Sequence, residues 1–237
     1  MDETSSRYLD AFNAIEKWLR DQTPESEHFD FPTLIDAVSQ RNHCVQRHAG
    51  KLKDLNRFRN FVVHDFSKNK AMAVPTKWVA DLISDVRKEL LSPEPLLSFA
   101  AKPVATCRPS DPITLAVTKM REGKFSQIPV CEEACCVDLL TAETIARWLS
   151  AELLANGGLV EEQTISEVLT HQEDTDNHTF VARSANVDDA LAAFESFMAR
   201  GKRLDAVLIT QNGRSTEGLL GIVTINDVPT LTRSCLA

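Results

Sequence analysis

The chain of 237 residues is 43% hydrophobic and 25% charged, proportions that are typical of a globular protein and exclude a largely disordered one. Its net charge of −8 argues against binding nucleic acid over the whole surface, although a local basic cleft is compatible with it. No apolar run approaches the ~20 residues of a membrane span. The polar start, residues 1–10, lacks the basic and apolar parts of a secretory signal. We therefore expect a cytoplasmic protein that binds no membrane and keeps its cysteines as free thiols.

Residues 1–92 are predicted to form an all-helical bundle, because their apolar residues recur every three or four positions along one stripe of each helix. This spacing is seen in Leu9, Phe12, Ile15, Leu19, Leu34, Ile35, Val38, Leu52, Leu55, Phe58 and Val62. A last helix is expected after Pro75, with Thr76 as its N-cap. His43 and His48 are five positions apart and so do not share a helical face, and we expect both at the surface.

The segment 55–65, L-N-R-F-R-N-F-V-V-H-D, carries the polar chemistry of this region. Asn60 and His64 are four apart on one helical face, and Arg59 lies one residue before that face. An arginine can hold a phosphate with two hydrogen bonds, and a histidine can accept or donate the proton of a ribose 2′-hydroxyl. The three side chains are therefore candidates for a catalytic centre acting on RNA.

This segment resembles the R-x4-H signature of HEPN domains, which are small helical bundles that often dimerise. The resemblance implies that Arg59, Asn60 and His64 would form a metal-independent endoribonuclease centre across a dimer. The alternative is that the motif is a structural polar cluster that pins helices together. Five nearby basic residues form either an RNA-binding rim or a solvated helical face; they are Arg41, Arg47, Lys51, Lys53 and Arg57.

Three prolines within residues 92–103 exclude a continuous helix there, so we predict a linker at 93–103. Beyond it, short apolar runs alternate with amphipathic helices in the order strand, helix, strand, strand, helix, and this order occurs twice. The first pass is predicted at 103–107, 111–123, 126–131, 135–140 and 141–155. The second is predicted at 179–183, 187–200, 205–210 and 218–223, with a short helix from 224.

The two passes form an internal repeat. Ala116 matches Ala190 at an offset of 74, Gly123 matches Gly201 at 78, and Thr141 matches Thr224 at 83. The offset increases by four residues between the first two matches, which is about one helical turn. An insertion of that size lengthens the helix and leaves its buried residues on the same face. Repeats shorter than about 70 residues rarely bury enough surface alone, so we expect the two to pack against each other.

The repeat resembles the cystathionine β-synthase (CBS) domain pair over residues 100–232. Its most specific parts are G-K-F-S-Q-I-P-V (123–130) and G-I-V-T-I-N-D-V (221–228). The expected fold class is therefore α+β, with an N-terminal all-helical bundle followed by a tandem CBS-domain α/β pair. The boundaries that we predict are 1–92 for the HEPN-like bundle, 104–160 for the first CBS repeat and 161–237 for the second.

The second motif has a physical interpretation of its own. A strand is expected to end at Val223, and Thr224 then opens a helix with its hydroxyl free, while Asp227 follows in the same first turn. A hydroxyl beside a carboxylate suits a ribose diol, which donates two hydrogen bonds. The alternative is that Thr224 and Asp227 form only a capping box. The resemblance implies the former, because T-x-x-D at this place is the ribose-binding element of the CBS family.

The resemblance also implies the rest of an adenine-nucleotide site. Ala105, Ser126, Gln127 and Ile128 would surround the adenine ring, and a basic group of the second repeat, Arg203, would contact phosphate. The ligand would be AMP, ADP, ATP or an adenine dinucleotide. No metal is expected, because the cysteines at 131, 135 and 136 lie in a turn without a partnering histidine.

The symmetry-related second site is expected to be weaker. Thr141 keeps the hydroxyl, but Thr144 stands where the ribose-binding carboxylate belongs, and Asp138 replaces a glycine that usually precedes the turn. We therefore predict one working site in each chain.

Three functions are compatible with these patterns. The first is a regulatory protein that senses an adenine nucleotide and changes a HEPN-like dimer or a partner. The second is a nucleotide-gated endoribonuclease that uses Arg59 and His64, with RNA as its substrate. The third is a non-catalytic scaffolding dimer. Both families usually associate in pairs, so we expect a homodimer in each case.

Overall fold

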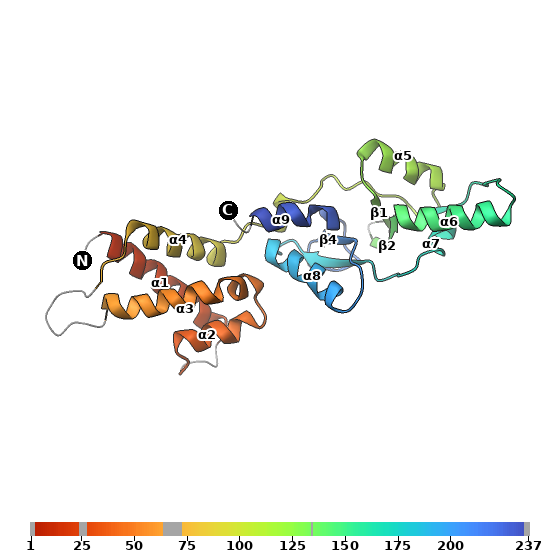
Figure 1. Cartoon of the computed structure of the whole chain (residues 1–237). Coiled ribbons are helices and arrows are strands. Elements are labelled where there is room, and N and C mark those ends of the chain that lie inside the picture. The colour runs from red at the N-terminus through yellow and green to blue at the C-terminus, as the bar shows by residue number, and fades with distance from the viewer. Residues whose placement is uncertain (1–2, 24–27, 64–72, 134, 235–237) are drawn as a thin grey trace. The chain divides into compact units, whose positions relative to one another are not determined.

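The structure is a computed structural model, and it describes residues 3–23, 28–63, 73–133 and 135–234. The chain divides into two compact units, Met1–Glu94 and Pro95–Ala237 (Figure 1). Within the described ranges, every helix is too short or too polar to cross a membrane. The predicted fold class is confirmed, since a helical unit precedes a unit of mixed helices and strands.

The first unit consists of α1 (Glu3–Asp21), α2 (Phe31–Ser39), α3 (His43–Val63) and α4 (Lys77–Leu91). Helix α1 packs along α4, and α2 packs along α3 (Figure 1). The apolar stripes of all four helices meet in one core, in which Phe12, Ile15 and Leu19 are at most 1% exposed. The Thr76 hydroxyl accepts a hydrogen bond from the Val79 N–H at 3.4 Å, which confirms Thr76 as the N-cap of α4. The expected bundle is thus formed by the expected residues.

One expectation for this unit was wrong. His48 is only 4% exposed, whereas His43 is exposed as expected. His48 lies on the same face of α3 as the buried residues Cys44 and Leu52, because all three are spaced at four residues. The ring is therefore part of the interior of the bundle.

The first repeat of the second unit contains α5 (Ile113–Gly123), β1 (Gln127–Glu132), β2 (Cys135–Thr141), α6 (Ala142–Ala155) and α7 (Ile165–Leu169), after a short 3-10 helix η2 (Leu96–Ser98). Strands β1 and β2 are antiparallel, with Gln127 opposite Thr141 and an irregularity after Val130. The segment predicted as a first strand, 103–107, forms only one isolated parallel bridge, from Cys107 to Val130. Pro103 begins this segment and Pro109 follows it by two positions, and neither can donate a hydrogen bond to a ladder, which limits the pairing.

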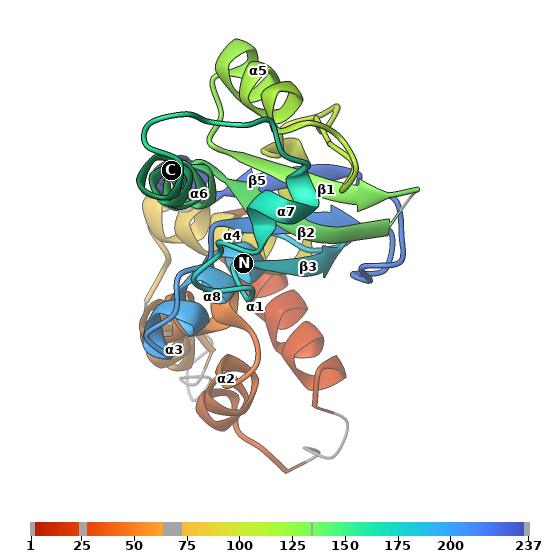
Figure 2. The ribbon, with the colours of Figure 1, turned by 90° about the vertical axis from the view of Figure 1, so that its right-hand side faces the viewer.

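The second repeat contains β3 (His178–Ala182), α8 (Val187–Ala199), β4 (Ala206–Thr210), β5 (Gly221–Thr224), η3 (Ile225–Asp227) and α9 (Val228–Ser234). Strand β3 pairs parallel with β4, and β4 pairs antiparallel with β5. The strands of both repeats lie in the middle of the unit, and helices α5, α6 and α8 lie around them (Figure 2). Buried side chains from β2, β4 and β5 form one cluster, which consists of Cys136, Leu139, Ala206, Leu208 and Ile222. The expected packing of one repeat on the other is therefore observed.

Residues from the predicted linker belong to the second unit. Leu96 is fully buried in the core around α8, and Ala100 is 8% exposed in the same core. Ala101 pairs with Ile222 of β5: the Ala101 N–H donates to the Ile222 carbonyl at 3.0 Å, and the Ile222 N–H donates back at 3.4 Å. The chain is therefore bonded to the last strand as soon as it leaves the helical unit.

Candidate functional site

A cavity of about 290 Å³ lies between the two repeats of the second unit. Three segments line it: the stretch that precedes α5, the turn from α5 into β1, and the end of β5 with η3. The lining residues are Ala101, Pro103, Val104, Ala105, Gly123, Lys124, Phe125, Gln127, Pro129, Ile222, Thr224, Asn226 and Asp227. We call this space the main cavity. Its size is that of a small-ligand pocket.

The Thr224–Asp227 pair lies at one side of the main cavity. The Thr224 N–H donates to Asp227 Oδ2 at 2.8 Å, and the Thr224 hydroxyl donates to the same oxygen at 2.9 Å. The expectation of a free hydroxyl was therefore wrong, because the two residues form a capping box at the start of η3. The cap uses only Oδ2 of the carboxylate, so Oδ1 can still accept a hydrogen bond from a ligand, and the Thr224 hydroxyl, which accepts from the Asp227 N–H, keeps one further lone pair.

Another part of the lining of the main cavity is apolar. Pro103, Val104 and Ala105 contribute small or aliphatic surfaces, as a planar aromatic ring requires. Gln127 is only 6% exposed, and its Oε1 accepts a hydrogen bond from the Ser126 hydroxyl at 2.9 Å. That bond fixes the Gln127 amide and leaves its NH2 group as a donor.

Lys124 is a residue of the main cavity that sequence reasoning missed. It is the C-cap of α5 in a left-handed conformation with φ of 54°, and it is exposed. Among the described lining residues it is the single cation. The available signal was its place in the motif G-K-F-S-Q-I-P-V, which also contains Gln127.

Of the seven residues predicted to bind the nucleotide, four line the main cavity: Ala105, Gln127, Thr224 and Asp227. Ser126 reaches it only through its bond to Gln127. Ile128 does not reach it, because the side chain is fully buried in the core of the first repeat.

Arg203 lies in a different cavity, of about 170 Å³, which we call the second cavity. The offset of 78 that relates Gly123 to Gly201 makes Arg203 the counterpart of Phe125, so the repeat symmetry places it in the opposite site. This corrects the assignment of Arg203 to the phosphate of a ligand bound at Thr224. The second cavity is lined by Thr141, Glu143, Thr144, Arg147, Glu173, Asp174, Asn177, Arg203 and Asp205.

The polar groups of the second cavity bind one another. Arg203 Nε lies 2.8 Å from Asp205 Oδ1, and its Nη1 lies 3.4 Å from Glu143 Oε2. Burial raises the pKa of Asp205, and the Arg203 guanidinium opposes that rise. Thr141 accepts a hydrogen bond from the Thr144 N–H at 3.1 Å, so the threonine pair caps α6 without supplying a carboxylate. That this site is the weaker one stays a prediction.

In the helical unit, the three residues predicted to form a catalytic centre are only partly described. The guanidinium of Arg59 lies over the Phe12 ring, with Cζ 5.4 Å from the ring centroid, and its Nε is buried without a hydrogen-bond partner among the residues that the structure describes. Asn60 is exposed, and His64 lies outside the described residues. The nuclease centre therefore stays a prediction.

One family model matches part of the second unit. The family model described as "CBS domain" matches residues 97–151, which contain α5, β1, β2 and most of α6. No curated protein matches the chain.

Several solved structures are similar to about 60% of the chain. They include the CBS domain pair of protein MJ0100 in complex with 5-methylthioadenosine and S-adenosyl-L-methionine, at 19% identity, with 98% of that chain covered and a TM-score of 0.43. CBSX2 in complex with AMP matches at 13% identity, with 98% of that chain covered and a TM-score of 0.44. The protein AcuB from Vibrio cholerae matches at 14% identity, with 93% of that chain covered and a TM-score of 0.45.

Proposed function

We propose that this protein is a regulatory protein whose second unit is a tandem CBS pair that binds an adenine nucleotide in the main cavity. The observation that carries the proposal is that Thr224 and Asp227, the T-x-x-D element of the resemblance, face a cavity that both repeats line. Asp227 Oδ1 and the Thr224 hydroxyl can accept the two hydrogen bonds that a ribose diol donates.

The other parts of the main cavity suit the other parts of a nucleotide. The apolar stretch 103–105 would contact the faces of the adenine ring, and the Gln127 NH2 group would donate to one of its ring nitrogens. Lys124 would approach the first phosphate. A single lining cation favours one phosphate over three, so AMP is the nucleotide that we expect to bind best.

Binding by the native protein is the direct test. AMP at one hundred times its dissociation constant should raise the free energy of unfolding by about 2.7 kcal/mol, because only the folded cavity binds it. Thermal unfolding of the full chain with and without AMP measures this increase. A scaffolding dimer with a vestigial pocket would instead melt at the same temperature in both samples.

Replacing Lys124 by Gln should weaken AMP binding about two- to fivefold and leave adenosine binding unchanged. The expected loss is small, because an exposed ion pair contributes only about 0.2–1 kcal/mol. Calorimetric titration with AMP and with adenosine measures both effects, and adenosine is the matched control because it lacks only the phosphate. Equal losses for both ligands would contradict a phosphate contact and would indicate that the substitution disturbs the turn.

The helical unit is the part on which a bound nucleotide would act, either as a HEPN-like dimer or through a partner. The alternative function, a nucleotide-gated endoribonuclease, would use Arg59 and His64 on RNA. Incubating RNA with the native chain and with His64→Ala separates the two functions. Cleavage at the same rate by both would exclude the predicted centre.

A further inference from the structure

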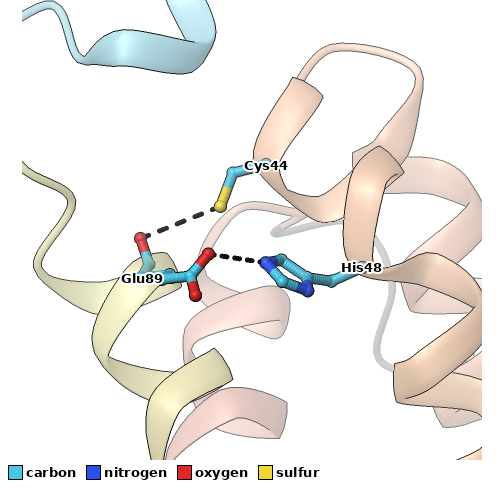
Figure 3. Close-up of side chains that lie close together, drawn as sticks. All are labelled: Cys44, His48 and Glu89. Atoms are coloured by element: carbon cyan, nitrogen blue, oxygen red, sulfur yellow. Dashed lines mark hydrogen bonds and ion pairs between the residues drawn. The ribbon is translucent and has the colours of Figure 1, made fainter. Parts of the chain in front are cut away.

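Three side chains with metal-binding atoms meet between α3 and α4, away from the main cavity. Cys44 and His48 come from the first turns of α3, and Glu89 comes from the last turns of α4 (Figure 3). One ligand atom from each residue lies within 4.8 Å of the other two. Cys44 and His48 are each 4% exposed, while Glu89 is half-buried. The cluster is thus shielded from solvent on the α3 side.

The helical spacing explains why these groups converge. Cys44 and His48 are four residues apart and so share one face of α3, which packs against α4. His48 Nε2 lies 2.8 Å from Glu89 Oε2, and the Cys44 thiol lies 3.8 Å from the Glu89 backbone carbonyl (Figure 3). Both residues of α3 are therefore directed at the same residue of α4.

We propose that Cys44, His48 and Glu89 bind a zinc ion, with water as the fourth ligand. Thiolate, imidazole and carboxylate are the three protein donors that zinc uses, and a thiolate disfavours magnesium and calcium. In a tetrahedral site with bonds of about 2.0–2.3 Å, the ligand atoms lie roughly 3.3–3.8 Å apart. The three ligand atoms lie within 4.8 Å of one another, and the His48–Glu89 contact is 2.8 Å. Small side-chain rotations that shorten the longest of these distances and lengthen the His48–Glu89 contact would reach the tetrahedral geometry.

The His48 ring can carry its proton on either nitrogen, so Nε2 is available as a zinc ligand. Its Nδ1 has no hydrogen-bond partner within the described part of the chain, so only the contact with Glu89 determines which ring nitrogen carries the proton. Without metal, Nε2 can donate its proton to Glu89. With zinc, the proton moves to Nδ1 and the Nε2 lone pair binds the ion. The Cys44 thiol releases its proton to solvent, so one proton leaves for each ion bound.

Arg47 supplies a cation to the same cluster. One of its terminal nitrogens lies 3.0 Å from Glu89 Oε2 and 3.6 Å from Cys44 Sγ. The guanidinium therefore contacts two of the three proposed ligands and must withdraw from Glu89 when zinc binds. Arg47 thus opposes binding, both by occupying the carboxylate and by repelling the ion.

Cobalt provides a spectroscopic test, because tetrahedral Co2+ absorbs strongly in the visible range and a thiolate ligand adds a charge-transfer band in the near ultraviolet. The reduced full-length chain titrated with Co2+ should show both features at one equivalent, and Zn2+ should abolish them. Cys44→Ser should remove the charge-transfer band, whereas Cys135→Ser, which alters a half-buried thiol of the second unit, should retain it. Retention of the band in Cys44→Ser, or its loss in Cys135→Ser, would place the metal elsewhere and overturn the proposal.

Arg47→Gln provides a second test, in which zinc affinity is expected to increase rather than decrease. The variant removes the competing cation and keeps all three ligands, so zinc affinity should rise about tenfold or more, as expected for one partly buried like charge. Competition with a zinc-binding dye measures the affinity, and equal helical circular dichroism of the metal-free proteins controls for folding. Unchanged or weaker zinc binding by a folded Arg47→Gln chain would also overturn the proposal.

Discussion

Replacing Asp227 by Asn should weaken AMP binding about ten- to a hundredfold while the second unit stays folded. The Asn side-chain oxygen can replace Oδ2 and accept from the Thr224 N–H and hydroxyl, so the capping box is retained. The NH2 group then replaces Oδ1, and a donor faces the ribose diol where an acceptor is needed. A hydrogen bond to a charged group contributes about 1.5–3 kcal/mol, which corresponds to this loss of affinity.

The matched control for this substitution is Asp189→Asn. Asp189 forms the same kind of capping box at the start of α8, where the Asn186 N–H donates to its Oδ2 at 2.9 Å. It lies outside both cavities, so AMP affinity should be unchanged in this variant. Calorimetry on the two variants separates binding from capping. If Asp227→Asn binds AMP as tightly as the native chain, the Thr224–Asp227 pair is only a helix cap.

Replacing Leu208 by Ala should destabilise the protein by about 2–5 kcal/mol. Leu208 lies in the middle of β4, is fully buried, and belongs to the cluster that joins the strands of the two repeats. Removing its side chain leaves a cavity that the paired strands on both sides cannot easily close. Urea unfolding of the full chain, followed by circular dichroism, measures the change.

Leu154→Ala is the control for this loss of stability, because Leu154 on α6 is 87% exposed. Its substitution should change the free energy of unfolding by no more than about 0.5 kcal/mol. Similar midpoints for the two variants would show that the Leu208 cluster contributes little to the association of the repeats.

Local periodicity predicted the elements well because each helix and strand is encoded by its own apolar pattern. The helices of the first unit follow from residues such as Phe12 and Ile15, whose spacing alone places them in the core. The role of residues 95–101 could not be predicted in this way. The prolines show that the segment is not a helix. They do not show that Leu96 packs in the core around α8, because that contact depends on the folded arrangement of both repeats.

The candidate sites show the same limit. Thr224 and Asp227 are three residues apart, so a local motif was enough to pair them. Arg203 was assigned to the wrong cavity, because its neighbours come from the other repeat and only the symmetry of the pair determines which ones. Cys44 and His48 have a visible four-residue spacing, but Glu89 follows 41 residues after His48 and joins them only when α4 packs on α3.

The paired backbone of Ala101 and Ile222 has a mechanical consequence. Both residues line the main cavity, and Ala101 belongs to the stretch that follows directly from the helical unit. Only four residues lie between the end of α4 at Leu91 and the buried Leu96, a segment that spans at most ~18 Å even when fully extended. A molecule in the main cavity would therefore contact this pair of backbones directly, and the burial of Leu96 and Ala100 in the core of the second unit would limit how far the pair can shift.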